Sequence, residues 1–159
     1  MSQQILILDF GSQYTQLIAR RVRELNVYCE IHPFNKIPPL TKDVKGVILS
    51  GSPCSVRDNG APSVDLNTFV DVPVLGVCYG AQLIAHNSGG NVLPSHQREY
   101  GRARLTTIDH HNELLKEMPL DTQVWMSHAD TIAKVPSSFE IIASTPSVAI
   151  AAYKVKNTK

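Results

Sequence analysis

The sequence predicts an α/β fold built on an open, mostly parallel sheet with helices on both faces. Short apolar runs typical of strands alternate with helical patterns along the first half of the chain. Such alternation favours parallel strands joined by helices that cover both sides of the sheet. The second half contains short strands separated by turns, which predict a smaller antiparallel or mixed extension. A length of 159 residues suggests one domain, 1–159, with its own core.

The first half supplies the expected parallel strands. Apolar residues at helical spacing between Leu17 and Leu25 predict a helix, which Asn26 is expected to end. The segment after Ser50 is rich in Gly, Ser, Pro and Asn and predicts a loop at the carboxyl end of a strand. In chain order, the expected elements are strand 4–10, helix 17–25, strand 27–31, strand 46–50, loop 51–62, a weak helix 64–70 and strand 74–77.

A reactive cysteine is predicted where the fourth strand meets the next helix. Cys78 follows the apolar run 74–77 in the pattern Gly-x-Cys-x-Gly, and apolar residues at helical spacing come after it. In such a nucleophile elbow, the glycines allow a tight turn that exposes the central side chain above the sheet. A position just before a helix also favours the thiolate. We therefore expect Cys78 to be a nucleophile, Cys29 a strand residue and Cys54 a loop thiol.

The loop after Ser50 is expected to share a crevice with Cys78. Open parallel sheets bind ligands beyond the carboxyl ends of their strands. Backbone N–H groups around Gly51 and Ser52, together with that of Tyr79, would then form an oxyanion hole for a tetrahedral intermediate on the sulfur. A plain connecting loop is the alternative interpretation of the same residues.

Composition argues against several classes of protein. The formal net charge is +1, with acids and bases interspersed, so neither nucleic acid nor a membrane surface is an expected partner. Three cysteines without a Cys-x-x-Cys pair argue against a disulfide framework and a zinc site, and we expect no metal site. The first apolar run is too short for a signal peptide or a membrane span, so a cytoplasmic location is expected.

The second half is expected to contain short strands and one basic loop. Arg98, Arg102 and Arg104 bracket residues 99–101, and a solvated surface is the default interpretation of such a cluster. The expected strands are 92–93, 104–108, 124–126, 141–143 and 148–155.

Five segments together resemble a known family. In chain order they are DFGSQYTQL (9–17), RRVRE (20–24), GVCYGAQ (76–82), REYG (98–101) and VWMSH (124–128). They resemble class I glutamine amidotransferases, and among these the amidotransferase domains of GMP synthases. The likeness covers almost the whole chain and implies a flavodoxin-like version of the predicted fold.

The resemblance implies a glutaminase reaction. Cys78 would attack the side-chain amide of L-glutamine, release ammonia and form a glutamyl thioester that water hydrolyses. Gln82 would contact the bound glutamine, and the N–H groups of Ser52 and Tyr79 would stabilise the oxyanion. The amino-acid end of glutamine would be held by the segment 127–130, which includes Ser127, Ala129 and Asp130.

The resemblance also implies a synthase (ATP-pyrophosphatase) domain, in the same chain or as a separate subunit. Ammonia would pass to that domain, which converts xanthosine monophosphate to GMP. We expect ATP and Mg only there, and no cofactor in this chain, because it lacks a phosphate-binding glycine-rich loop with lysine. A homodimer of the longer protein is compatible with the family. The basic loop containing Arg98 would lie towards the synthase domain.

The histidine and glutamate of the family are missing from the expected place. Class I enzymes carry them in a His-Pro-Glu motif after the segment that corresponds to 148–155, and this chain reaches Lys159 without it. We therefore expect a C-terminally truncated part of a longer protein. His128 lies in the substrate-binding segment, so it is not assigned as the base.

Two other interpretations of the sequence stay open. The chain could bind glutamine or a synthase partner without hydrolysing glutamine. It could also be another cysteine hydrolase that shares only the elbow, although segments 9–17 and 125–128 argue against this.

Overall fold

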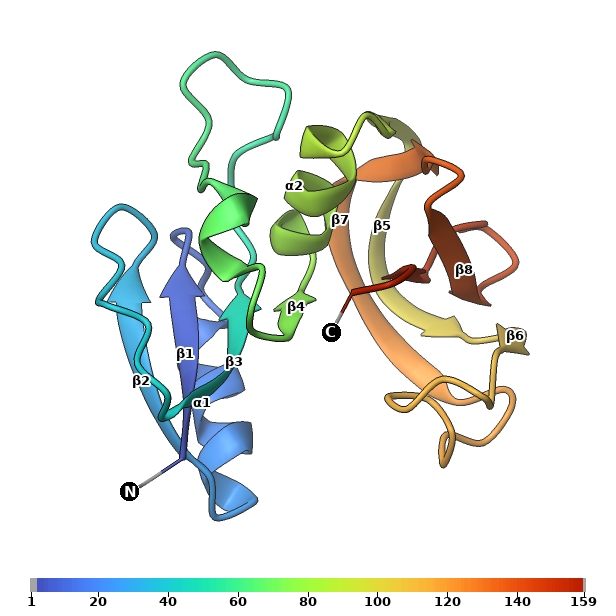
Figure 1. Cartoon of the computed structure of the whole chain (residues 1–159). Helices are drawn as coiled ribbons and strands as arrows, with labels where there is room; N and C mark the ends of the chain where they lie inside the picture. Colours follow the sequence, from blue (N-terminus) through green and yellow to red (C-terminus); the bar gives the residue numbers. More distant parts are fainter. Residues whose placement is uncertain (1–2, 159) are drawn as a thin grey trace. The chain divides into compact units, whose positions relative to one another are not determined.

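The computed structural model describes residues 3–158, without the side chains of residues 96–99 (Figure 1). The chain forms two compact units, one made by residues up to Ile84 and the other by Ala85–Asn157. The boundary falls within a helix, and each unit has its own sheet structure. No helix in the described residues is both long and apolar enough to cross a membrane.

A four-stranded parallel sheet forms the first unit, in the order β2-β1-β3-β4. The central strand β1 pairs with β2 and β3 on its two sides, so that Ile7 lies opposite both Ile31 and Ile48. The four arrows of Figure 1 point in one direction, as predicted for strands joined by crossovers. The bounds of these strands are β1 (Gln4–Asp9), β2 (Tyr28–Pro33), β3 (Val44–Leu49) and β4 (Val74–Gly76).

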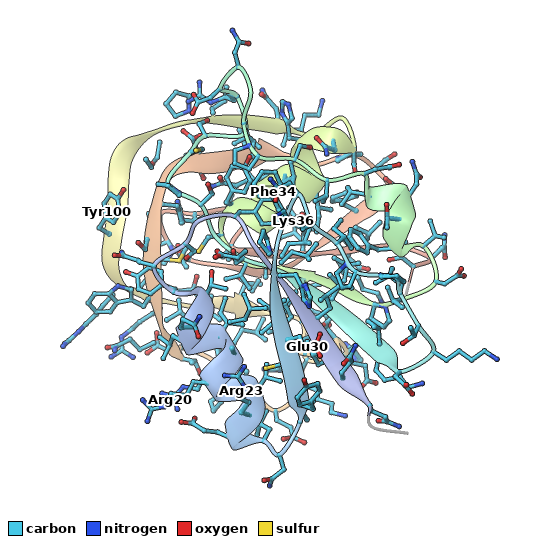
Figure 2. The ribbon with its side chains drawn as sticks, turned by 90° about the vertical axis from the view of Figure 1, so that its left-hand side faces the viewer. Arg20, Arg23, Glu30, Phe34, Lys36 and Tyr100 are labelled. Atoms are coloured by element: carbon cyan, nitrogen blue, oxygen red, sulfur yellow. The ribbon has the colours of Figure 1, made fainter. Side chains whose placement is uncertain are left out.

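Helix α1 (Thr15–Glu24) covers one face of this sheet. Its Ala19 packs with Ile7 of β1 and Cys29 of β2, all of them buried, which confirms the predicted strand position of Cys29. Arg20 and Arg21 pair with Glu24 on the exposed side of the helix, whereas Arg23 donates to the Cys29 carbonyl of β2 at 3.4 Å. Figure 2 labels Arg20 and Arg23 on this helix. The helix ends as predicted, because Asn26 adopts a left-handed backbone with φ of 58°.

Two short elements bring the chain to the proposed elbow. The weak helix expected at 64–70 is a single 3₁₀ turn, η1 (Leu66–Phe69). Its first turn is closed by the Asp65 carboxylate, which accepts from the Asn67 N–H at 3.0 Å. After β4, helix α2 (Tyr79–Asn87) follows, and it ends where the Gly90 N–H donates to the carbonyl of Ala85 at 2.8 Å.

Two antiparallel sheets form the second unit. One is a ribbon of β5 (Asn91–Arg104) and β7 (Gln123–Lys134), and the other has the order β6-β8-β9. These shorter strands are β6 (Thr107–Ile108), β8 (Phe139–Ser144) and β9 (Ala152–Val155). Leu105, Leu115, Ile142 and Ala143 form a buried hydrophobic cluster in this unit. The predicted antiparallel extension is therefore confirmed.

The prediction of a basic loop is wrong, because residues 98–104 belong to strand β5. They are ordered by a ladder to β7, in which Tyr100 lies opposite Ser127 and Arg102 opposite Trp125. The predicted strand at 92–93 is part of this long strand, whose register is irregular between Pro94 and Glu99. The predicted strand 104–108 is divided, because β5 ends at Arg104 and β6 begins at Thr107. The side chain of Arg98 lies outside the described residues. Strand 148–155 was also predicted too long, since β9 begins at Ala152.

Candidate active site

The elbow at Cys78 has the predicted strand–turn–helix order, but its glycines have a different role. Cys78 itself takes the left-handed backbone, with φ of 50°. A Cβ on Gly76 would lie 2.6 Å from the Ala81 nitrogen, and one on Gly80 would overlap the Leu49 carbonyl oxygen. The glycines therefore allow α2 to start directly against β3 and β4, while the cysteine makes the turn. A non-glycine residue held at positive φ is a recognised feature of functional sites.

Burial raises the pKa of the Cys78 thiol above its ordinary value. This direction is opposite to the one expected for a thiol just before a helix. The residue as a whole remains exposed, so a small reagent can reach it. Because the neutral thiol is favoured, attack on a substrate requires a base that removes the proton.

Among the described residues of the first unit, no histidine is in place to take this proton. His32 is its one histidine, and the ring donates a hydrogen bond to the Glu30 carboxylate on the same strand, at 3.0 Å. Among the described side chains of this unit, no imidazole hydrogen-bonds the sulfur of Cys78. The described residues also contain no cluster of His, Cys, Asp or Glu that could hold a metal ion.

The loop after β3 lies against the elbow, as predicted. A Cβ placed on Gly51 would be 3.7 Å from the Cβ of Cys78 and 3.3 Å from Oγ of Ser12. Three backbone N–H groups next to this point, those of Gly51, Ser52 and Tyr79, donate to no acceptor within the described residues. The candidate oxyanion donors therefore belong to the two segments that meet at this point, the loop after β3 and the elbow.

Two buried side chains hold this loop in place. The Ser50 hydroxyl accepts from the Phe10 N–H at 3.0 Å and donates to the Gly51 carbonyl at 3.0 Å. At the other end of the loop, the Tyr79 hydroxyl donates to the Pro62 carbonyl at 2.5 Å. The Tyr79 ring is buried next to Phe10, and burial raises its pKa to about 12. Tyr79 can therefore position the loop with its side chain and offer its N–H at the elbow.

Sequence reasoning missed Ser12 and Ser50. Each is a serine at or just beyond the carboxyl end of a predicted strand, which is a usable signal for a residue near a ligand in a parallel sheet. Without the structure, nothing indicates that both serines converge on Gly51.

The remaining predicted site residues lie in two places. Gln82 is buried on the first turns of α2, and its N–H donates to the Cys78 carbonyl at 3.0 Å. Ser127, Ala129 and Asp130 lie on β7, within the second unit. Asp130 is buried, whereas Ala129 is exposed. The structure thus brings Gly51, Ser52, Cys78, Tyr79 and Gln82 into one unit and the 127–130 segment into the other.

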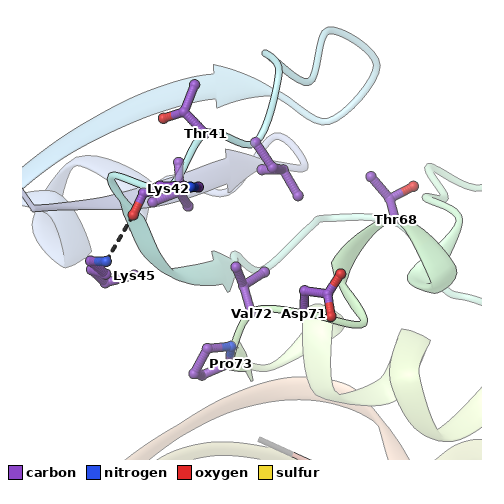
Figure 3. Close-up of a pocket in the computed structure, with 9 residues that line it drawn as sticks. Thr41, Lys42, Lys45, Thr68, Asp71, Val72 and Pro73 are labelled. Carbon is purple, nitrogen blue, oxygen red and sulfur yellow. Dashed lines mark hydrogen bonds between the residues drawn. The ribbon is translucent and has the colours of Figure 1, made fainter.

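A groove lies at the opposite end of the parallel sheet, and Figure 3 shows the residues that line it. Its walls come from the start of β3, the segment before it and the turn after η1. The Lys45 ammonium group donates a hydrogen bond to the Lys42 carbonyl at 2.8 Å. None of the predicted site residues lines this groove, so the chemistry is not assigned to it.

Comparisons with known proteins identify the family of the chain. The family model for glutamine amidotransferase class-I matches residues 6–158. GMP synthase [glutamine-hydrolyzing] from Cytophaga hutchinsonii is 67% identical over 157 residues, which are 98% of this chain and 31% of that protein. The protein of the same name from Phocaeicola vulgatus is 58% identical over 160 residues, which are 100% of this chain and 31% of that protein. The chain therefore spans about a third of these relatives.

Solved structures show the same fold. A candidate GMP synthase component from Thermoplasma acidophilum has a TM-score of 0.86 and 25% identity, covering 99% of this chain and 80% of that one. A glutamine amidotransferase from Thermotoga maritima has a TM-score of 0.75 at 18% identity, covering 97% of this chain and 72% of that one. Because the family model matches residues 6–158, almost the whole of this chain, the chain belongs to the class I glutamine amidotransferases.

Proposed function

We propose that this chain is the glutaminase part of a GMP synthase, which hydrolyses L-glutamine at Cys78 and supplies ammonia for the conversion of xanthosine monophosphate to GMP. The observation that carries the proposal is the approach of the Gly51 loop to the Cys78 elbow. With Cys78 as the nucleophile, this contact would put backbone N–H donors beside the sulfur, as acyl transfer requires. The names of the relatives, GMP synthase [glutamine-hydrolyzing], support the same reaction.

The proposed reaction has two covalent steps. The Cys78 sulfur attacks the side-chain carbonyl carbon of glutamine, and the N–H groups of Ser52 and Tyr79 stabilise the resulting oxyanion. The C–N bond then breaks, and the nitrogen leaves as ammonia after it receives a proton. Water attacks the glutamyl thioester, which releases glutamate and restores the thiol.

Both steps need a proton carrier, because burial favours the neutral Cys78 thiol. A histidine oriented by a carboxylate would take the thiol proton and deliver it to the leaving ammonia. We place this pair in the part of the relatives that the chain does not span. The isolated chain is then expected to hydrolyse glutamine slowly.

The remaining assignments concern recognition and the whole protein. Gln82 would contact glutamine beside the elbow, and Ser127, Ala129 and Asp130 would hold its amino-acid end. A synthase domain with sites for ATP and Mg would receive the ammonia, so this chain would need no cofactor of its own. A cytoplasmic location suits such an enzyme of purine biosynthesis.

The proposal is tested by the release of glutamate and ammonia from L-glutamine. We expect hydrolysis by the wild-type chain, its loss in Cys78→Ala, and its retention in Cys54→Ala. Cys54 is a matched control because, like Cys78, it is a free and exposed cysteine. It lies near the start of the loop that follows β3. Glutamine hydrolysis that persists in Cys78→Ala would reject the assignment of the nucleophile.

A further inference from the structure

Ser12 lies beside the proposed oxyanion site, although the proposed chemistry gives it no role. A Cβ on Gly51 would touch Ser12 on one side, with 3.3 Å to Oγ, and Cys78 on the other. The absence of a side chain at Gly51 therefore lets both residues approach the backbone at this point. Ser12 is half-buried, on the loop between β1 and α1.

The loop that carries Ser12 is held by several hydrogen bonds. The Asp9 carboxylate accepts from the Gly11 N–H at 2.9 Å and from the buried Thr15 hydroxyl at 2.8 Å. Gly11, between β1 and Ser12, adopts φ of 92°, a conformation that glycine takes readily. A Cβ on Gly11 would lie 3.6 Å from the Pro53 ring, so this loop also contacts the loop after β3. The Ser12 side chain is thus fixed in position before any ligand binds.

The Ser12 hydroxyl retains a proton that it can donate. A serine hydroxyl has one donor and two acceptor sites. Oγ accepts from the Tyr14 N–H at 3.0 Å, which uses an acceptor site. Its own proton has no acceptor among the described residues, and it does not hydrogen-bond the Cys78 sulfur. A half-buried donor beside a candidate nucleophile is therefore available to a ligand.

We propose that Ser12 is a substrate-binding residue whose hydroxyl donates a hydrogen bond to the side-chain oxygen of the bound glutamine. This inference rests on the proposed function. The Ser52 and Tyr79 N–H groups belong to the two segments that meet at Gly51, and the Ser12 hydroxyl adds a side-chain donor there. Because that oxygen becomes negatively charged in the transition state, a fixed third donor accelerates acylation more than it strengthens ground-state binding.

The test compares two reagents on Cys78 by peptide-resolved mass spectrometry. Diazo-oxo-norleucine alkylates the thiol with loss of N₂ and carries a ketone oxygen in place of the amide oxygen of glutamine. Iodoacetamide alkylates the same thiol, with loss of iodide and a proton, and reports only the reactivity and accessibility of the sulfur. The ratio of the two rates removes the effect of any change in thiolate fraction.

For Ser12→Ala we expect the ratio to fall by roughly tenfold or more, with the iodoacetamide rate within about twofold of wild type. Ser12→Asp is the second variant, because its carboxylate can still accept from the Tyr14 N–H at the start of α1 but has no proton to donate. Its ratio should fall as well. Ser88→Ala, at an exposed position after α2, is the control and should leave the ratio unchanged.

Three results would overturn the inference. An unchanged ratio in both Ser12 variants means that the hydroxyl contacts no reacting oxygen. An equal loss of both rates in Ser12→Ala and Ser12→Asp means that Ser12 acts only through the structure of the loop. Absence of diazo-oxo-norleucine labelling in the folded wild type rejects the proposed function itself, which the first two results leave intact.

Discussion

Gly80 lies so close to the carbonyl oxygen of Leu49 that any side chain at this position would overlap it. The Gly80 N–H also donates to the carbonyl of Ser50 at 3.1 Å. The first turn of α2 is therefore seated on the end of β3. This one contact fixes the elbow relative to the loop that begins at Ser50, so the arrangement of the site depends on the packing of a glycine.

Gly80→Ala should destabilise the fold, because backbone atoms cannot move aside as a side-chain terminus can. We expect about 1–3 kcal/mol of lost stability in urea unfolding, together with slower alkylation of Cys78 by a glutamine mimic. Gly46→Ala is the control, since its Cβ would meet the flexible end of Ile5 at 3.2 Å. Equal stability of the two variants would contradict the close packing described for Gly80.

Ser50→Ala should loosen the same region through hydrogen bonding. The change leaves the buried Phe10 N–H without its acceptor and frees the Gly51 carbonyl. The expected loss is about 1–3 kcal/mol of unfolding free energy. Ser88→Ala, on the exposed surface, should change stability by less than about 0.5 kcal/mol. A Ser50 variant as stable as the Ser88 variant would argue against a structural role for this hydroxyl.

Tyr79→Phe removes the hydroxyl that anchors the loop at Pro62 while it keeps the buried ring. We expect faster hydrogen exchange of amides in residues 51–62 and a loss of about 1 kcal/mol in stability. Tyr14→Phe is the matched control, because Tyr14 is 41% exposed and its hydroxyl makes no hydrogen bond within the described residues. Unaltered exchange in the 51–62 loop would show that the Pro62 contact does not hold it.

The reactivity of Cys78 should depend on pH in a direction set by its burial. The pKa of Cys78 is raised in the folded chain. The rate of its alkylation by iodoacetamide should therefore increase at a higher pH in the folded chain than in the urea-unfolded chain. The folded state then retains the proton over a range in which the unfolded state has lost it. The contribution of this group to stability is therefore present below the unfolded pKa and declines as pH rises towards the folded pKa. A lower apparent pKa in the folded chain would contradict this account.

The sequence was sufficient to predict the parallel sheet and the elbow, because both depend on local patterns. The apolar runs of β1 and β3 and the Gly-x-Cys-x-Gly spacing around Cys78 determine strand, turn and helix without distant partners. The long ribbon was missed for the opposite reason. Residues 98–104 are polar and basic, and their order comes from pairing with β7, which no local pattern reveals.

The site was predictable only in part for a similar reason. The parallel topology implies that Gly51 and Cys78 meet, since both follow the carboxyl ends of strands. The roles of Ser12 and Ser50 depend on contacts between loops far apart in the chain. The position of Cys78 before a helix predicts a lowered pKa, and this prediction is wrong because burial of the thiol raises the pKa.

The most direct test of the account is labelling with diazo-oxo-norleucine, read by intact mass on the wild-type chain, Cys54→Ala and Cys78→Ala. The account predicts a single adduct on the first two proteins and none on the third. Cys54 is exposed, so it reports non-specific reaction with accessible thiols. No adduct on a wild-type chain that is shown to be folded, or an adduct that persists in Cys78→Ala, would contradict the claim that Cys78 is the nucleophile of a glutamine site.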